Sequence, residues 1–190
     1  MDGPNTATMS QEEAVLRQLE YSHRWNFDVE HVVELFHVCQ AHPGTTALEI
    51  GSYRGHCALA MALAGLAVIS IDTSAEHLEA RAQLIRDHRQ SDFVAFLIES
   101  SDVELRLPRS FDIILHDNGR RGAKLLGELE AFWHQKLLPG GLLIVHNVEQ
   151  IDVARLVRRL GAESHIVTTD SRKRQLGYFA KSVQPMMRGT

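Results

Sequence analysis

From residue 46 onward the chain alternates between short apolar segments and helical patterns, and this alternation restricts the fold more than any other feature. The apolar segments predict strands, and two of them contain the continuous aliphatic runs 113–115 and 142–145. Such strands, separated by helices, are typical of a parallel sheet with helices on both faces. The predicted strands are 46–50, 67–71, 93–98, 111–116, 141–146, 163–168 and 176–180, and the predicted helices between them are 55–65, 75–89, 101–106, 121–136 and 150–160.

Both ends of the chain depart from this alternation. Only residues 169–175 separate the last two predicted strands, so we expect a β-hairpin whose last strand is antiparallel. At the other end, residues 1–9 predict a loose tail, a capping-box pattern predicts a helix over 10–21, and apolar spacing predicts another over 28–40. The expected fold is therefore α/β: a Rossmann-like, doubly wound sheet of seven strands, mostly parallel with an antiparallel last strand, and a helical N-terminal extension.

The composition narrows the class of protein. A net charge of −4 and an isoelectric point near 6.2 leave no global positive field that would hold nucleic acid. Two cysteines, Cys39 and Cys57, are too few for a disulfide framework or a cysteine-rich metal site. Residues 1–8 lack signal-peptide features, and the longest apolar run, 58–71, is shorter than the roughly 20 residues that span a bilayer. We expect a cytoplasmic protein that binds neither nucleic acid nor membranes.

The first predicted strand is followed by a glycine turn, Glu49-x-Gly51-x-x-x-Gly55. Glycines permit a sharp turn and a close approach between the backbone and a nucleotide-like ligand. Tyr53 can cover such a ligand, and Cys57 lies in the first helical turn, where it can face a terminal carboxylate. A plain tight turn without a ligand is the alternative.

The second and third strands end in polar residues. Asp72 lies 21 residues after Gly51, a distance at which a carboxylate can accept hydrogen bonds from two ribose hydroxyls. A role as helix N-cap is the alternative for Asp72, with Thr73 and Ser74 as competitors. The third strand is followed by the segment 99–102, Glu-Ser-Ser-Asp, which can hydrogen-bond an adenine edge, cap the next helix, or do both.

The fourth and fifth strands end in His116-Asp117 and His146-Asn147. Adjacent parallel strands lie roughly 4.8 Å apart, so Asp117, His146 and Asn147 are expected to converge. They can ligate a divalent metal ion or form a polar cluster that orders the loops without metal. Strand alternation predicts that His116 points away from Asp117, as a packing or hydrogen-bonding residue.

A basic loop, 172–174 (Arg-Lys-Arg), connects the last two predicted strands. If the sixth strand is parallel, this loop opens on the ligand edge of the sheet. It can then attract an acidic substrate, or it is simply solvated.

Together these residues resemble the class I S-adenosylmethionine-dependent methyltransferases, and most closely their small O-methyltransferases of the catechol, caffeoyl-CoA and natural-product types. The resemblance covers about residues 44–181 and is carried by the glycine turn over 48–55, Asp72, the segment 111–117 and the segment 137–148. It implies S-adenosylmethionine as cofactor, contacted by Glu49, Gly51, Ser52, Tyr53, Gly55, Cys57, Asp72, Thr73, Ser100, Ser101 and Asp117.

Two departures from the family pattern concern the reaction site. The family has an Asp-Asn metal pair where this chain has His146-Asn147, which suits another metal or none. The family places a lysine or histidine base three residues after the metal aspartate, where this chain has Arg120. Arginine cannot be deprotonated in proteins, so Arg120 instead can bind a carboxylate or phosphate of the substrate. His146 and His116 then become the candidate bases, since imidazole titrates near neutrality.

The expected function is methyl transfer from S-adenosylmethionine to a small-molecule acceptor, with O-methylation favoured. Asp117, His146 and Asn147 would activate the acceptor directly or through a divalent metal, and Arg120 and Asn147 would bind it. Residues 1–43 would form a lid or part of the acceptor pocket, and 44–190 the cofactor-binding domain. An acidic acceptor and a homodimer are both compatible with these features.

Two alternatives remain open at this point. The fold can host a non-methylating reaction, a hypothesis motivated by Arg120, which stands where the family has a lysine or histidine base. It can also serve as a non-catalytic cofactor-binding subunit, but the intact set of Gly51, Gly55 and Asp72 argues against this.

Overall fold

The computed structural model describes residues 9–21, 27–106, 108–169 and 173–183; residues 1–8 of the tail predicted over 1–9 lie outside them. Within these residues, seven strands form one sheet in the order β3-β2-β1-β4-β5-β7-β6. The strands are β1 (Thr46–Ile50), β2 (Ala67–Asp72), β3 (Val94–Ile98), β4 (Phe111–His116), β5 (Leu137–His146), β6 (Glu163–Thr169) and β7 (Gln175–Ala180). The first five pair in parallel, and β7 is antiparallel to both β5 and β6, which confirms the expected fold.

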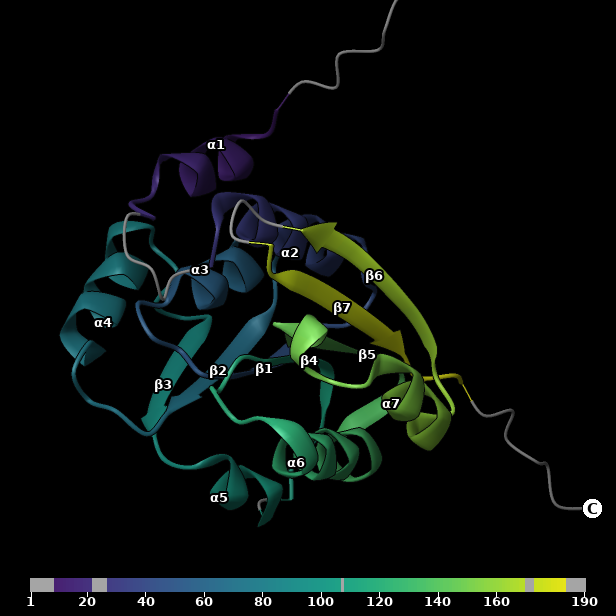
Figure 1. Cartoon of the computed structure of the whole chain (residues 1–190). Coiled ribbons are helices and arrows are strands. Elements are labelled where there is room, and N and C mark those ends of the chain that lie inside the picture. Colours follow the sequence, from purple (N-terminus) through teal and green to yellow (C-terminus); the bar gives the residue numbers. More distant parts are fainter. Residues whose placement is uncertain (1–8, 22–26, 107, 170–172, 184–190) are drawn as a thin grey trace, which may run out of the picture.

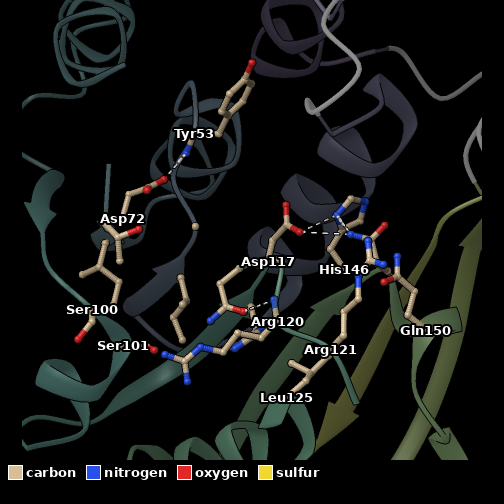
Figure 2. Close-up of a pocket in the computed structure, with 18 of the residues that line it drawn as sticks. Tyr53, Asp72, Ser100, Ser101, Asp117, Arg120, Arg121, Leu125, His146 and Gln150 are labelled. Atoms are coloured by element: carbon tan, nitrogen blue, oxygen red, sulfur yellow. Dashed lines mark hydrogen bonds and ion pairs between the residues drawn. The ribbon is translucent and has the colours of Figure 1, made fainter. Parts of the chain in front are cut away.

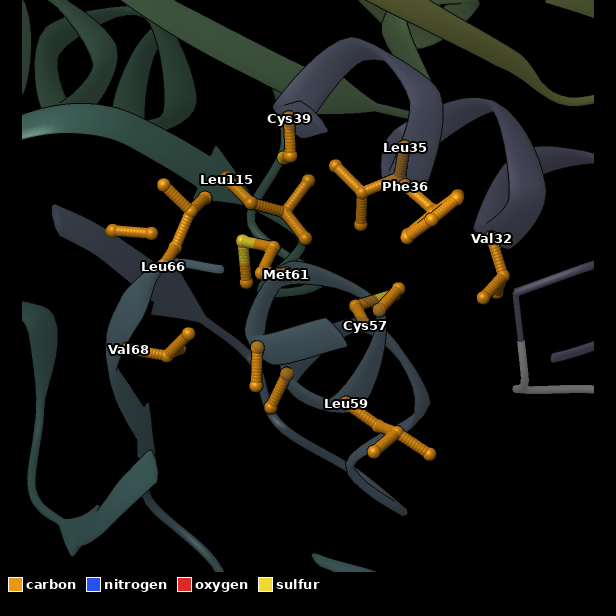
Figure 3. Close-up of a cluster of buried hydrophobic side chains, with 14 of the residues drawn as sticks. Val32, Leu35, Phe36, Cys39, Cys57, Leu59, Met61, Leu66, Val68 and Leu115 are labelled. Atoms are coloured by element: carbon orange, nitrogen blue, oxygen red, sulfur yellow. The ribbon is translucent and has the colours of Figure 1, made fainter. Parts of the chain in front are cut away.

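Helices cover both faces of the sheet, as Figure 1 shows. On one face α2 and α3 pack on the strands, and Val32, Phe36 and Met61 belong to their shared buried cluster (Figure 3). On the other face Leu129 of α6 and Leu156 of α7 belong to a second cluster. The helices are α1 (Gln11–Gln18), α2 (Val29–Ala41), α3 (His56–Leu63), α4 (Leu78–Asp87), α5 (Ser101–Arg106), α6 (Gly122–Gln135) and α7 (Val153–Leu160), with a 3₁₀ turn η1 (Val148–Gln150).

The differences from the expected elements lie at element ends. The Ser10 side chain caps α1 by accepting a hydrogen bond from the Glu13 amide, as the capping box predicted, but the helix ends at Gln18 rather than at residue 21. The helix predicted over 150–160 was wrong at its start, because the Asp152 side chain accepts from the Arg155 amide and begins α7 at Val153. Strand β5 begins at 137 instead of 141.

The N-terminal extension is packed against the main sheet. Helix α2 contacts α3, and its buried residues share one core cluster with β1 and β4. Among the described residues, no helix is both long and apolar enough to cross a lipid bilayer. This packing brings the beginning of α2 to the carboxyl ends of the central strands.

Candidate active site

A cavity of about 660 Å³ opens beyond the carboxyl ends of β1, β2, β4 and β5 (Figure 2). Ligands of open α/β sheets bind at this position, where the strand order reverses between β1 and β4. The predicted site residues that line it are Gly51, Tyr53, Asp72, Thr73, Ser100, Ser101, His116, Asp117, Arg120, His146 and Asn147. Glu49, Ser52 and Cys57 line instead a small neighbouring cavity of about 20 Å³, and Gly55 lines neither.

The glycine turn between β1 and α3 has the backbone conformation that its sequence predicted. Gly51 and Gly55 have φ angles of +99° and +83°, which L side chains rarely adopt. A Cβ on Gly51 would lie 2.0 Å from the carbonyl oxygen of Asp117. Gly51 is therefore needed for the close contact between the turn and the loop after β4.

Asp72 at the end of β2 orders this turn. Its Oδ2 accepts a hydrogen bond from the Tyr53 amide (3.0 Å), and its Oδ1 accepts one from the Ser74 amide (2.9 Å). The buried guanidinium of Arg81 lies 3.4 Å from Oδ2. The alternative role as a helix cap is wrong, because α4 begins only after His77. The carboxylate is instead held at the cavity wall with its oxygens oriented.

Beneath the glycine turn, Glu49 is buried and linked through the Ser70 hydroxyl to the Ser52 hydroxyl. Burial raises the pKa of Glu49 to about 8, although the hydrogen bond from Ser70 lowers it. Burial likewise raises the pKa of Cys57. Cys57 is thus a neutral buried thiol beside the turn, not a side chain of the main cavity.

Asp117, His146 and Asn147 come together as the strand order predicted. His146 Nδ1 lies 3.0 Å from Asp117 Oδ1, and the Asn147 amide nitrogen lies 3.1 Å from the same imidazole nitrogen. The Asn147 nitrogen also donates to Asp117 Oδ1 at 3.4 Å. Asn147 has a left-handed backbone (φ +59°), which turns the chain sharply after β5.

Two residues of the N-terminal extension complete the environment of His146. The ring of Phe27 stacks on the imidazole with centroids 3.9 Å apart, and His31 of α2 meets it edge-on at 5.3 Å. His146 Nε2 is buried and has no hydrogen-bond partner among the described residues. The sequence carried no signal for Phe27 or His31 as site residues, because only the packing of α2 places them here.

His116 points to the other side of β4, as strand alternation predicted. Its Nε2 lies 3.3 Å from the Glu128 carboxylate of α6. Glu128 also accepts two hydrogen bonds from Asn118 (3.1 and 3.2 Å) and lies 3.3 Å from Arg120 Nε. Burial raises the pKa of Glu128, but the hydrogen bond and charge of His116, helped by Ser101 and Asn118, outweigh it and hold the pKa at about 2.

Glu128 was missed in the sequence, although a signal existed. It lies on the predicted helix 121–136 between Leu125, Leu129 and Phe132, all buried on one face. A carboxylate on such a face needs a partner, since an unpaired buried charge is costly. Here its partners join the loop after β4 to α6.

The two arginines before α6 extend in opposite directions from the chain (Figure 2). Arg120 reaches toward Ser101 and lies 3.6 Å from Asp102 of α5. Arg121 reaches toward His146 and Gln150 and also lines the cavity. Of the predicted basic loop 172–174, Arg172 lies outside the described residues, and Arg174 lines the cavity.

The sequence matches one family, described as a methyltransferase domain, over residues 48–148. The match covers more than half of the chain, so the protein belongs to this methyltransferase domain family. No curated protein matches the chain significantly.

Solved structures of methyltransferases share the whole architecture. An O-methyltransferase from Bacillus cereus in complex with SAH has a TM-score of 0.71 and 17% identity, with 90% of each chain covered. A methyltransferase from Geobacter sulfurreducens has a TM-score of 0.72 and 18% identity over 93% of this chain and 91% of its own. An O-methyltransferase from Streptomyces achromogenes involved in tomaymycin synthesis, in complex with SAM, has a TM-score of 0.68 and 16% identity over 92% and 91%. At sequence identities this low, the structural similarity establishes the fold alone.

Proposed function

We propose that the protein transfers a methyl group from S-adenosylmethionine to a hydroxyl group of a small-molecule acceptor. One observation carries this proposal: a single cavity joins the glycine turn and Asp72 to the Asp117–His146 pair. The O-methyltransferases from Bacillus cereus and Streptomyces achromogenes, which share the fold, bind SAH and SAM respectively. The resemblance in the glycine turn and Asp72 agrees with the same cofactor.

The cofactor end would be formed by the turn after β1 and by the ends of β2 and β3. Asp72 would accept hydrogen bonds from ribose hydroxyls, since its two oxygens are oriented by backbone amides at the cavity wall. Ser100 and Ser101 line the same end and supply hydroxyl groups for a base edge. When bound there, S-adenosylmethionine would supply an electrophilic methyl group for the acceptor oxygen, with S-adenosylhomocysteine as the leaving group.

The acceptor end would activate the hydroxyl. Asp117 and His146, whose Oδ1 and Nδ1 atoms lie 3.0 Å apart, form a pair that can take up the proton lost by that hydroxyl. Asn147 holds both groups in place, and Phe27 fixes the plane of the imidazole. The N-terminal extension thereby serves as one wall of the acceptor pocket. We assign the base to this pair rather than to His116, whose ring is engaged by Glu128.

A metal ion does not fit the Asp117, His146 and Asn147 set as the structure arranges it. The nitrogen of the Asn147 amide, rather than its oxygen, is directed at the other two side chains. No group of three or more histidine, cysteine, aspartate or glutamate side chains suited to a metal occurs in the described parts of the chain.

Calorimetric titration of the purified protein with S-adenosylhomocysteine and S-adenosylmethionine tests the cofactor. We expect saturable binding, and its absence at millimolar ligand would refute the proposal. Product mass then tests the reaction, since one methyl group adds about 14 Da. His146→Ala should lower turnover by about 10²- to 10⁴-fold, the usual range for loss of a general base, with cofactor affinity retained. The matched variant His134→Ala, at an exposed position of α6, should behave as wild type.

A further inference from the structure

We propose that the methyl acceptor is an anion, and that Arg121 binds its carboxylate or phosphoryl group beside the Asp117–His146 pair. This inference rests on the proposed function and names the chemical class of the second substrate. It also moves the anion-binding role from Arg120, where the sequence placed it, to the next residue.

Arg120 is already engaged. Its Nε lies 3.3 Å from the buried Glu128 carboxylate, and a terminal nitrogen lies 3.6 Å from Asp102. Both contacts hold its guanidinium at the α5 side of the cavity, toward Ser101 (Figure 2). A second anion there would have to compete with two carboxylates, so Arg120 is poorly suited to select an acceptor.

Arg121 differs from Arg120 in its contacts. Its side chain lines the cavity and extends toward His146 and Gln150, yet it makes no hydrogen bond or ion pair with any described residue. It stands at the N-cap position of α6 without capping the helix through its side chain. A guanidinium presents a planar fork of donors that matches a carboxylate or a phosphoryl group in a bidentate way. Within the described residues, Arg121 is thus a cation without a partner at the acceptor end.

The charges around Arg121 favour an anion in the same place. The acid on this side of the cavity, Asp117, is already bound by His146 and Asn147. Arg174 lines the same cavity and adds positive charge. The amino-terminal end of α6, a helix of 14 residues, carries the positive end of its dipole at this point.

A second observation points to a ligand at this end. The His146 side chain is 1% exposed, and its Nε2 is buried without a hydrogen-bond partner in the described part of the chain. A buried polar nitrogen that lacks a partner in the free protein is common where a ligand supplies one. An anionic acceptor held by Arg121 would lie beside this imidazole and the carboxylate paired with it.

Equilibrium binding to the protein saturated with S-adenosylhomocysteine tests the inference. The probes are 4-hydroxybenzoate, 4-hydroxyphenyl phosphate and the neutral isostere 4-hydroxybenzamide, each titrated to 10 mM. The protein variants are wild type, Arg121→Gln, Arg121→Lys and, as the matched control, Lys124→Gln. Lys124 is exposed one turn further along α6 and does not line the cavity.

We expect wild type to bind at least one anionic probe about 10- to 100-fold more tightly than the amide, the range for a charge-assisted hydrogen-bonded pair. Arg121→Gln should abolish this preference, Arg121→Lys should retain part of it, and Lys124→Gln should keep all of it. The carboxylate and phosphate arms show which anion is preferred.

Two results would overturn the inference: no preference for either anion in wild type, or an unchanged preference in Arg121→Gln. In that case Arg121 is a solvated surface residue. Failure of S-adenosylhomocysteine to bind at all would instead refute the proposed function, so the two failures are distinguishable.

Discussion

The two ends of the cavity are built in different ways. At the proposed cofactor end the polypeptide backbone sets most of the geometry: Gly51 and Gly55 adopt positive φ angles, and Asp72 is oriented by two amide groups. At the acceptor end the geometry depends on side chains that come from distant parts of the chain, as far apart as His31 and His146. The geometry of the first end depends mainly on local backbone conformation. The geometry of the second depends on contacts between segments that are far apart in the sequence.

Because of this difference, amino-acid substitutions are expected to affect the two ends of the cavity differently. Replacing a residue in the glycine turn disturbs the backbone of both ends at once, because Gly51 packs against the carbonyl of Asp117. Replacing Arg121, by contrast, alters one exposed guanidinium and no contact of the described core. A fold of this kind can therefore keep its cofactor while its acceptor varies. The following predictions test this contrast, in order of their expected effect on ligand binding and turnover.

The largest effect is expected for Gly51→Ala. The new methyl group would overlap the Asp117 carbonyl, and the φ of +99° disfavours a side chain. We expect a loss of about 2–5 kcal/mol in the free energy of unfolding and more than 100-fold weaker binding of S-adenosylhomocysteine. Urea unfolding and calorimetry measure both quantities.

Gly65→Ala is the matched control for this variant. Gly65 has a similar φ of +95°, but a Cβ there would meet no atom within 4 Å. It should cost only the backbone strain of about 1–2 kcal/mol and leave affinity unchanged. Equal effects of the two substitutions would show that contact with Asp117 is unimportant.

Asp72→Ala should weaken S-adenosylhomocysteine binding by about 10- to 100-fold, through loss of hydrogen bonds to a charged acceptor. Stability should fall as well, since the buried guanidinium of Arg81 loses its carboxylate and the amides of Tyr53 and Ser74 lose their acceptor. Calorimetry at constant pH measures the affinity, with Asp92→Ala as a control for loss of an exposed negative charge. An unchanged affinity would refute the ribose-binding role.

Glu128→Gln should affect the loop after β4 and leave cofactor binding nearly unchanged. His116 and Arg120 would lose their charged partner, so the loop that carries Asp117 would be less ordered. We expect kcat to fall about 10-fold and unfolding free energy to fall by about 1–3 kcal/mol, with S-adenosylhomocysteine affinity changed less than threefold. Glu130→Gln removes only an exposed pair with Arg159 and should leave kcat unchanged. A rise in KM alone would contradict a positioning role.

The smallest effect on ligand binding is expected for Glu49→Gln at pH 6. The folded-state pKa of Glu49 is raised from 4.5 to about 8, so the folded protein holds this proton more tightly than the unfolded chain. The stability due to Glu49 is therefore fully present below pH 4.5 and is lost as the pH rises toward 8. A glutamine resembles the protonated acid and does not ionise, so the variant should not lose this stability as the pH rises.

Unfolding free energies measured from pH 5 to pH 9 test this difference. Glu49→Gln should gain stability relative to wild type with a slope of at most about 1.4 kcal/mol per pH unit up to pH 8. The control Glu30→Gln, at an exposed position of α2, should follow the wild-type curve. Parallel curves for wild type and Glu49→Gln would show that Glu49 is ionised in the folded protein.

Some features of the acceptor end could be predicted from the sequence, and others could not. The convergence of Asp117, His146 and Asn147 followed from strand order, because neighbouring parallel strands end at one edge. The direction of His116 followed from alternation along β4. The sequence pointed to Arg120 alone and gave no signal for Arg121, since the exit of the chain from the loop into α6 decides which end of the cavity each guanidinium reaches.

The amino-acid sequence by itself determined the order of strands and helices, the antiparallel last strand, and the glycine turn with its acid at the next strand. These features depend on local backbone preferences and on hydrophobic periodicity, both of which act over short stretches. Only the tertiary structure decided that Phe27 and His31 enclose His146, that Glu128 anchors the loop after β4, and that Gly51 touches Asp117. Those contacts join residues far apart in the chain, and their geometry follows from how α2 and α6 pack on the two faces of the sheet.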